Sequence, residues 1–162
     1  MDTVDLNTHL DKESPMNSQE KIIKNTADID EILGNVSSIS QLEDYLGHNA
    51  IPEFDSIGEY LEFMLTKKGL EKAQVIKDSD IQRNYGYQIF SGVKQPGRNK
   101  LIALALAMGL NLEEVQRALS IAKEGKLYSK DKRDSILIYS INKKQTVLDT
   151  NNLLFEMGEE LL

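Results

Sequence analysis

The sequence predicts an all-α protein. Apolar residues recur at helical spacing from residue 26 onwards, and capping residues and glycines mark where helices begin and end. No stretch keeps the alternation of apolar and polar residues that a half-buried strand requires. The run LIALALAM, residues 101–108, is apolar enough for a buried strand, but its alternating alanines favour a helix buried on most sides.

The N-terminal third divides into two parts. Residues 1–25 are polar and lack both periodicities, which predicts a disordered tail. A short acidic helical segment is expected over residues 26–50. Its first helix ends at Gly34, and its second begins at the capping-box pair Ser40 and Glu43.

The central segment, residues 51–125, predicts a bundle of five helices. Each expected element has its own start or stop signal, such as the pair Ser56 and Glu59 at the first. In chain order the elements are a helix from Ser56 to Gly69, short helices at 71–78 and 82–91, the 101–108 helix, and a helix capped by Asn111 with Glu114.

The C-terminal segment, residues 126–162, is too apolar for a loose tail. It predicts two helices, one near 132–142 and one from Thr146 to Gly158, that form a hairpin packed on the central bundle. One interpretation is that the hairpin enlarges a small core. The other is that it supplies a dimer surface.

Composition excludes several classes of protein. The 162-residue chain contains no cysteine, so disulfides, thiolate metal sites and cysteine nucleophiles are ruled out. No apolar run approaches the roughly 20 residues that cross a bilayer. The N-terminal residues lack the basic and apolar regions of a secretory signal. We therefore expect a cytoplasmic protein with no membrane partner.

The net charge of −7 is unevenly distributed. Residues 1–55 carry −9, residues 56–126 carry +3 and residues 127–162 carry −1. The basic excess thus lies in the central segment, which permits binding to a polyanion. The acidic N-terminal part could keep the chain soluble, fold against the basic face and compete with a ligand there, or bind a protein partner.

Catalytic, metal and cofactor sites are not expected. GVKQPGRN, residues 92–99, has the glycine spacing of a phosphate-binding loop, but Arg98-Asn99 replaces the Lys-Ser/Thr pair. His9 and His48 have no second His, Cys or spaced carboxylates to complete a metal site. A nucleophile with its base cannot be assembled either, so we expect no enzyme activity.

A set of anchors with fixed, gap-free spacing runs through the central segment. They are Gly69-Leu70, the pair Val75-Ile76, a turn residue at Asp80, buried positions at Ile81 and Ile89, Gly92 at a helix end, and Pro96 in the following loop. With these anchors, residues 56–122 resemble the phage-repressor (Xre-type) helix-turn-helix family, also described as lambda repressor-like.

The sequence departs from that family at several positions. Asp80 stands where the turn glycine is usual, and aspartate tolerates a left-handed conformation better than most residues. Gly86 replaces a branched apolar residue, and we expect Tyr85 and Phe90 to fill the space. Gly97 stands where a capping serine is common.

The resemblance implies a bacterial or phage-type transcription regulator whose recognition helix, residues 82–91, enters the major groove of double-stranded DNA. At 100° per residue Ile81, Tyr85 and Ile89 share the core-facing arc, and the polar residues take the opposite arc. The base-reading residues implied are Arg83, Asn84 and Gln88. The DNA backbone or groove-edge residues implied are Lys72, Gln82, Tyr87, Ser91, Lys94, Arg98 and Lys100.

Two further expectations concern partners. Repressor-type domains usually bind paired half-sites, so the C-terminal helices would form a homodimer. The alternative function is a protein-interaction or signalling adaptor that keeps the helical scaffold without binding DNA. The cluster Tyr85-Gly86-Tyr87 suits that alternative, because tyrosines are common in protein interfaces.

Overall fold

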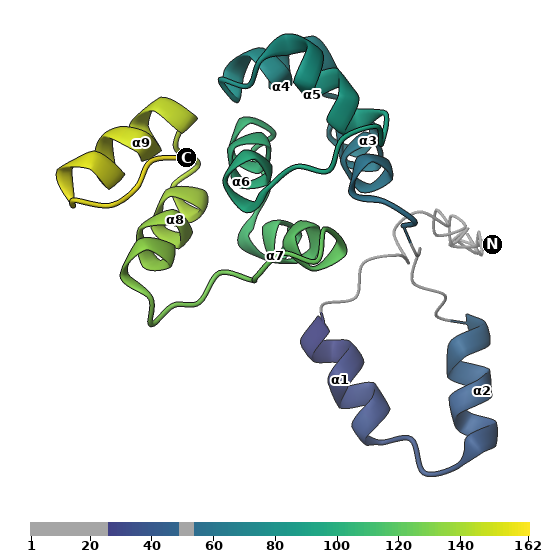
Figure 1. Ribbon diagram of the computed structural model, residues 1–162. Coiled ribbons are helices and arrows are strands. Elements are labelled where there is room, and N and C mark those ends of the chain that lie inside the picture. Colours follow the sequence, from purple (N-terminus) through teal and green to yellow (C-terminus); the bar gives the residue numbers. More distant parts are fainter. Residues whose placement is uncertain (1–25, 49–53) are drawn as a thin grey trace, which may run out of the picture. The chain divides into compact units, whose positions relative to one another are not determined.

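The computed structural model describes residues 26–48 and 54–162, and every regular element in those residues is a helix (Figure 1). The predicted all-α class is confirmed for this part of the chain. The chain divides into two compact units, residues 1–53 and 54–162. The tail expected at residues 1–25 lies outside the described residues.

The first unit contains a pair of short helices, α1 (Thr26–Gly34) and α2 (Ile39–His48). The predicted capping box at Ser40 is wrong, because α2 starts earlier in the chain. The hydroxyl of Ser38 accepts the backbone N–H of Gln41 at 3.2 Å, and the Gln41 side chain accepts the N–H of Ser37 at 2.9 Å. This Ser-x-x-Gln arrangement caps the helix in place of Ser40 with Glu43.

The second unit contains seven helices, all of which the sequence predicted. They are α3 (Ile57–Lys68), α4 (Lys72–Asp78), α5 (Arg83–Phe90), α6 (Arg98–Ala107), α7 (Leu112–Ile121), α8 (Lys132–Asn142) and α9 (Val147–Glu156). The caps expected at Ser56, Asn111 and Thr146 are present. One detail differs, since the Glu59 carboxylate accepts from the backbone of Asp55.

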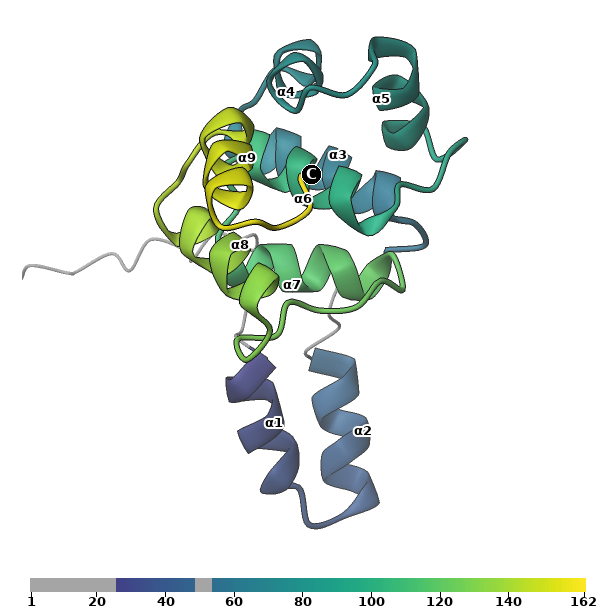
Figure 2. The same cartoon turned by 60° about the vertical axis from the view of Figure 1, so that its left-hand side comes forward.

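Helix α6 forms the centre of the second unit. Residues 101–106 are all buried, which confirms a helix covered on most sides. In Figure 2 the pair α4 and α5 lies at one end of the unit and α7 at the other, with α3 and α6 between them. The core that these helices share consists mainly of Leu, Ile, Ala and Val side chains.

Helices α4 and α5 approach closely because Gly86 has no side chain. A methyl group at Gly86 would lie 2.5 Å from Cγ2 and 2.9 Å from Cγ1 of Ile76. The Ile76 side chain, which is 2% exposed, therefore occupies the space that a larger residue at position 86 would need. We predicted that Tyr85 and Phe90 fill this space. The side chain that lies against Gly86 is instead Ile76, which comes from α4.

A second glycine, Gly58, lets another helix contact the C-terminal end of α5. At Gly58, near the start of α3, a methyl group would lie 2.8 Å from the carbonyl oxygens of both Ile89 and Phe90. The backbone of α3 thus contacts the C-terminal end of α5 directly. Since α5 has eight residues, too few for a stable isolated helix, these contacts with α3 and α4 hold it in place.

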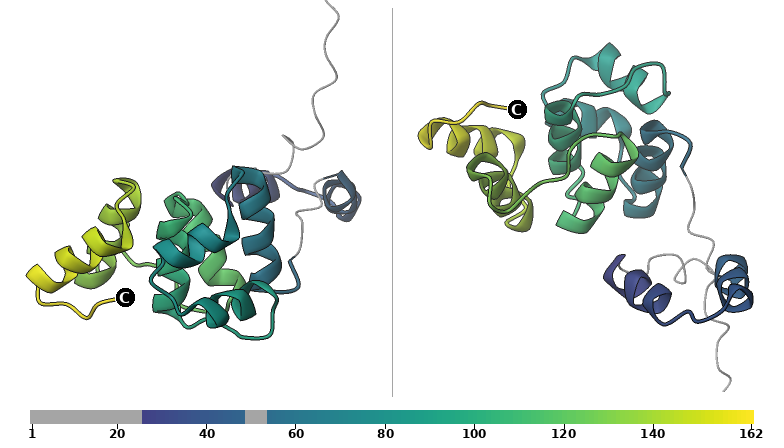
Figure 3. Two further views of the ribbon diagram at one scale, coloured as in Figure 1. Left: turned by 90° about the horizontal axis from the view of Figure 1, so that it is seen from above. Right: turned by 60° about the horizontal axis from the view of Figure 1, so that its bottom comes forward.

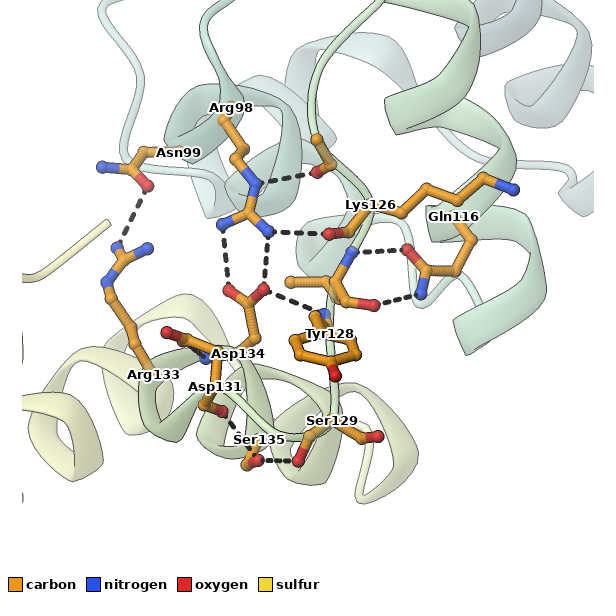
Figure 4. A network of polar contacts seen from close by, with 12 residues as sticks. Arg98, Asn99, Gln116, Lys126, Tyr128, Ser129, Asp131, Arg133, Asp134 and Ser135 are labelled. Atoms are coloured by element: carbon orange, nitrogen blue, oxygen red, sulfur yellow. Dashed lines mark hydrogen bonds and ion pairs between the residues drawn. The ribbon is translucent and has the colours of Figure 1, made fainter.

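Helices α8 and α9 form a hairpin at the C-terminal end of the unit (Figure 3). A polar network attaches this hairpin to the rest of the unit (Figure 4). The guanidinium of Arg98 at the start of α6 donates to both carboxylate oxygens of Asp134 on α8, at 3.0 and 2.9 Å. It also donates to the backbone oxygens of Gly125 and Lys126. The Arg133 guanidinium donates to Asn99 at 3.0 Å. Charged hydrogen bonds thus join α6 and α8.

Asp134 is buried, and its protonation state is set by this network. Burial alone would raise the pKa of Asp134. The hydrogen bonds from Arg98 and from the backbone of Tyr128, together with the charges of Arg98 and Arg133, outweigh burial and hold the pKa below its ordinary value of 3.8. The folded state therefore favours the ionised carboxylate.

We expect Gly86→Ala to lower the free energy of unfolding by about 1–3 kcal/mol, because overpacking against the stiff, β-branched Ile76 outweighs the better helix propensity of alanine. Chemical denaturation measures the change. Gly97→Ala is the control, since that position is open and has a negative φ. Adding Ile76→Ala should make the double variant less destabilised than the two single changes combined. If the double variant is destabilised by the sum of the two single effects, the close contact between Ile76 and Gly86 is contradicted.

We expect Asp134→Asn to cost about 2 kcal/mol at pH 7, because it removes the charge that accepts the hydrogen bonds of a partly buried ion pair. Because the pKa of Asp134 is lower in the folded state than in the unfolded state, the ionised carboxylate stabilises the fold at pH values above the unfolded-state pKa. This stabilisation is lost as the pH falls through the folded-state pKa. The difference between wild type and variant should thus be constant from pH 7 to about 5 and shrink below about 4. Denaturation at several pH values measures it, with the exposed Asp149→Asn as control. A difference that persists undiminished at pH 3 would refute the interpretation.

Candidate nucleic-acid interface

The turn between α4 and α5 is fixed by local hydrogen bonds. The buried Ser79 hydroxyl donates to the carbonyl of Ile76 at 2.7 Å, and Asp80 adopts a left-handed conformation with φ of 57°. The side-chain oxygen of Gln82 accepts the backbone N–H of Tyr85 at 2.8 Å and caps α5. Glycine adopts this left-handed conformation most easily, and aspartate tolerates it better than most residues. Asp80 can therefore occupy the turn position where the family usually has glycine.

Helix α5 has one buried and one exposed side, as the 100° spacing predicts. Ile81, Gly86, Ile89 and Phe90 are buried, and Tyr85 is half-buried. The exposed residues at and around the helix are Gln82, Arg83, Asn84, Tyr87, Gln88 and Ser91. All three predicted base-reading residues therefore lie on the exposed side. We call this set of six residues the outward face of α5.

The outward face presents polar groups that the described part of the chain does not occupy. Neither Asn84 nor Gln88 uses its side-chain amide in a hydrogen bond within residues 26–48 and 54–162. The guanidinium carbon of Arg83 lies 5.8 Å from the centre of the Tyr87 ring, within the range of a cation–π contact. The Ser91 hydroxyl donates to the carbonyl of Gln88 at 3.2 Å. Amide and guanidinium donors are thus available to an external ligand.

The lysines around α5 differ in their surroundings. Lys94 and Lys100 are exposed, and neither forms an ion pair within the described ranges. The backbone N–H of Lys94 donates to the carbonyl of Gln88 at 3.0 Å, which folds the loop after α5 back onto the helix. Lys72 forms an ion pair with Glu62, and its Nζ lies 5.4 Å from the centre of the Phe90 ring. A phosphate at Lys72 would therefore compete with Glu62.

Arg98 is placed differently from the other implied DNA contacts. Its guanidinium donates to Asp134 and to the backbone oxygens of Gly125 and Lys126, as Figure 4 shows. These bonds give Arg98 a structural role in attaching the C-terminal hairpin. Because four of its five guanidinium N–H groups are engaged in this way, we assign Arg98 to the attachment of the hairpin in place of the predicted DNA contact.

Sequence reasoning missed four features of this region. The capping bond of Gln82 and the contact between Arg83 and Tyr87 could have been found from spacings of three and four residues along a helix. The ion pair between Lys72 and Glu62 joins two helices and had no local signal. Val93, which is 68% exposed in the loop after α5, was not singled out either.

Among residues 26–48 and 54–162, no group of three or more His, Asp or Glu side chains is arranged to hold a metal ion. Within those ranges no helix combines the length and apolarity that crossing a membrane requires. Comparisons with family models, with curated proteins and with solved structures found no match for this chain.

Proposed function

We propose that this chain is a cytoplasmic, sequence-specific DNA-binding transcription regulator. In this proposal α4 and α5 form a repressor-type helix-turn-helix, and α5 is the recognition helix in the major groove. The observation that carries the proposal is the outward face of α5, where Arg83, Asn84 and Gln88 are exposed on a helix whose opposite side is buried.

The chemistry of that face fits the edges of base pairs. Arginine can donate two hydrogen bonds to guanine O6 and N7, and asparagine or glutamine can bond adenine N6 and N7. Lys94 and Lys100 supply positive charge beside the helix without a competing carboxylate among the described residues. Such lysines bind phosphates and set the register of a protein on the duplex without reading sequence.

The packing of α4 against α5 supports the register of the resemblance. The repressor family usually has a small alanine at the position of Ile76 and a branched apolar residue at the position of Gly86. Here the large residue lies on α4 and the small one on α5, and the two are in direct contact. The exchange keeps the total volume between the helices similar, which is the kind of change that cores tolerate best.

A homodimer is part of the proposal, and α9 offers the surface for it. Leu148 and Phe155 on α9 are 70% and 76% exposed, and their spacing of seven residues puts them on the same face of the helix. A second copy that covers them would give the dimer that binding to paired half-sites, about 34 Å apart, requires. Sedimentation of wild type and Phe155→Asp should show a dimer and a monomer, respectively. A wild-type chain that stays monomeric with and without DNA would contradict the dimer.

The same exposed face of α9 favours the second candidate function, a protein-interaction or signalling adaptor. Large exposed apolar side chains commonly mark protein interfaces. Ile39 and Leu46 on α2 are also exposed, at 77% and 60%, and the acidic segment that carries them could bind such a partner. The adaptor differs from the regulator in one measurable respect, because it requires no selective DNA binding.

We expect the purified full chain to enrich particular fragments from genomic DNA, and Arg83→Ala/Gln88→Ala to abolish that enrichment. Each lost bidentate base contact removes about 1–3 kcal/mol of discrimination. Binding is measured across a salt series, because phosphate contacts alone give salt-dependent binding without selectivity. The control is Lys130→Ala/Asn142→Ala, which removes one cation and one amide at exposed positions away from α5. Unselective wild-type binding, unchanged in the α5 variant, would favour the adaptor.

A further inference from the structure

Two arginines in this unit are held in opposite ways. Arg98 donates hydrogen bonds from Nε and both terminal nitrogens to acceptors within the chain. Arg83 is exposed, and its recorded contact within the described ranges is the ring of Tyr87, one helical turn further on. Arg98 has four of its five guanidinium N–H groups in use, and Arg83 keeps its N–H groups available.

A contact with an aromatic ring restrains a guanidinium without using its hydrogen-bond donors. The cation lies over the face of the ring, and the N–H groups point outward in the plane of the guanidinium. A free arginine side chain loses rotamer entropy when it is fixed. Restraint before binding therefore reduces the cost of placing both donors on one acceptor pair.

The position of Tyr87 suits such a role. Its side chain is 36% exposed on the outward face, and it follows Arg83 by four residues, the spacing at which helical side chains meet. The guanidinium carbon lies 5.8 Å from the ring centre. Because the ring lies on the same side of α5 as Asn84 and Gln88, the restrained guanidinium stays among the amides that the proposed function assigns to base reading.

We propose that Tyr87 is a positioning residue for sequence specificity. Its ring holds the Arg83 guanidinium for a bidentate contact with guanine O6 and N7, so each half-site of the bound DNA contains a G·C pair at one fixed position. This inference rests on the proposed DNA-binding function. It assigns Tyr87 a role through its ring, in contrast to a phosphate contact through its hydroxyl.

The test begins with selection of bound sequences from a random double-stranded DNA library by the full-length chain. The same selection is made with Tyr87→Phe, Tyr87→Leu and Arg83→Ala. Both substituted positions are exposed, and thermal unfolding checks that each of the three variants remains folded. The strength of the guanine preference at the fixed position, relative to the other three bases, is the readout.

We expect wild type to prefer guanine by about tenfold or more, and to lose a similar factor when that base is replaced by 7-deazaguanine, which lacks the N7 acceptor. Tyr87→Phe should keep the preference, because it keeps the ring. Tyr87→Leu should reduce the preference toward that of Arg83→Ala while the preferences at other positions remain. This pattern separates positioning from a general loss of affinity.

Three outcomes would overturn the inference. They are a selected site without a fixed guanine, a guanine preference that survives in Tyr87→Leu, and a preference that is lost in Tyr87→Phe. The last outcome would assign the role to the hydroxyl. A wild-type chain that selects no sequence at all would instead overturn the proposed function itself, so the two failures are distinguishable.

Discussion

The contact between Ile76 and Gly86 is the constraint on which the candidate interface depends. Helix α5 is too short to be stable alone, so packing against its neighbours holds it in position. Gly86 lets α4 approach until the Ile76 side chain lies directly against the backbone of α5. Gly58 lets α3 contact the other end of the helix. With one side held in this way, the side chains of the opposite side are directed to solvent in a fixed order.

Charged side chains have two different roles in the second unit, residues 54–162. In the network around Arg98 and Asp134, the charges satisfy each other and join the C-terminal hairpin to α6. On the outward face of α5, Arg83 and the two amides are left without such partners among the described residues. A buried charge must be paired to be tolerated, whereas an exposed one need not be. Asp134 is the buried charge here, and its pairing engages the half-buried Arg98, whereas the donors of the exposed Arg83 remain available to a ligand.

Most of the helices could be predicted from sequence because their signals are local. Asn111 with Glu114 and Thr146 with Asp149 cap their helices through residues three positions apart. The alternation of buried and exposed residues along α5 follows from helical geometry alone. The start of α2 was misplaced because several serines precede it, and only the backbone geometry shows that Ser38 is the cap.

The remaining errors concern contacts between residues far apart in the chain. Arg98 carried the sequence signal of a phosphate-binding residue, and its acceptor Asp134 follows 36 positions later. The residues next to Gly86 in the chain did not indicate that Ile76 fills the space beside it, because that contact joins two helices. For the candidate site, spacing predicted which side chains are exposed. It could not predict which cations are already engaged within the unit, as Lys72 is by Glu62.

The proposal that the outward face of α5 lies in the major groove can be tested most directly by nuclear magnetic resonance. Uniformly ¹⁵N-labelled chain is titrated with the DNA fragment that it binds best. We predict that the largest changes fall on the backbone amides of residues 82–94 and on the side-chain amides of Asn84 and Gln88. Changes confined to α9 or α2, with those two side-chain amides unaffected, would contradict the proposal.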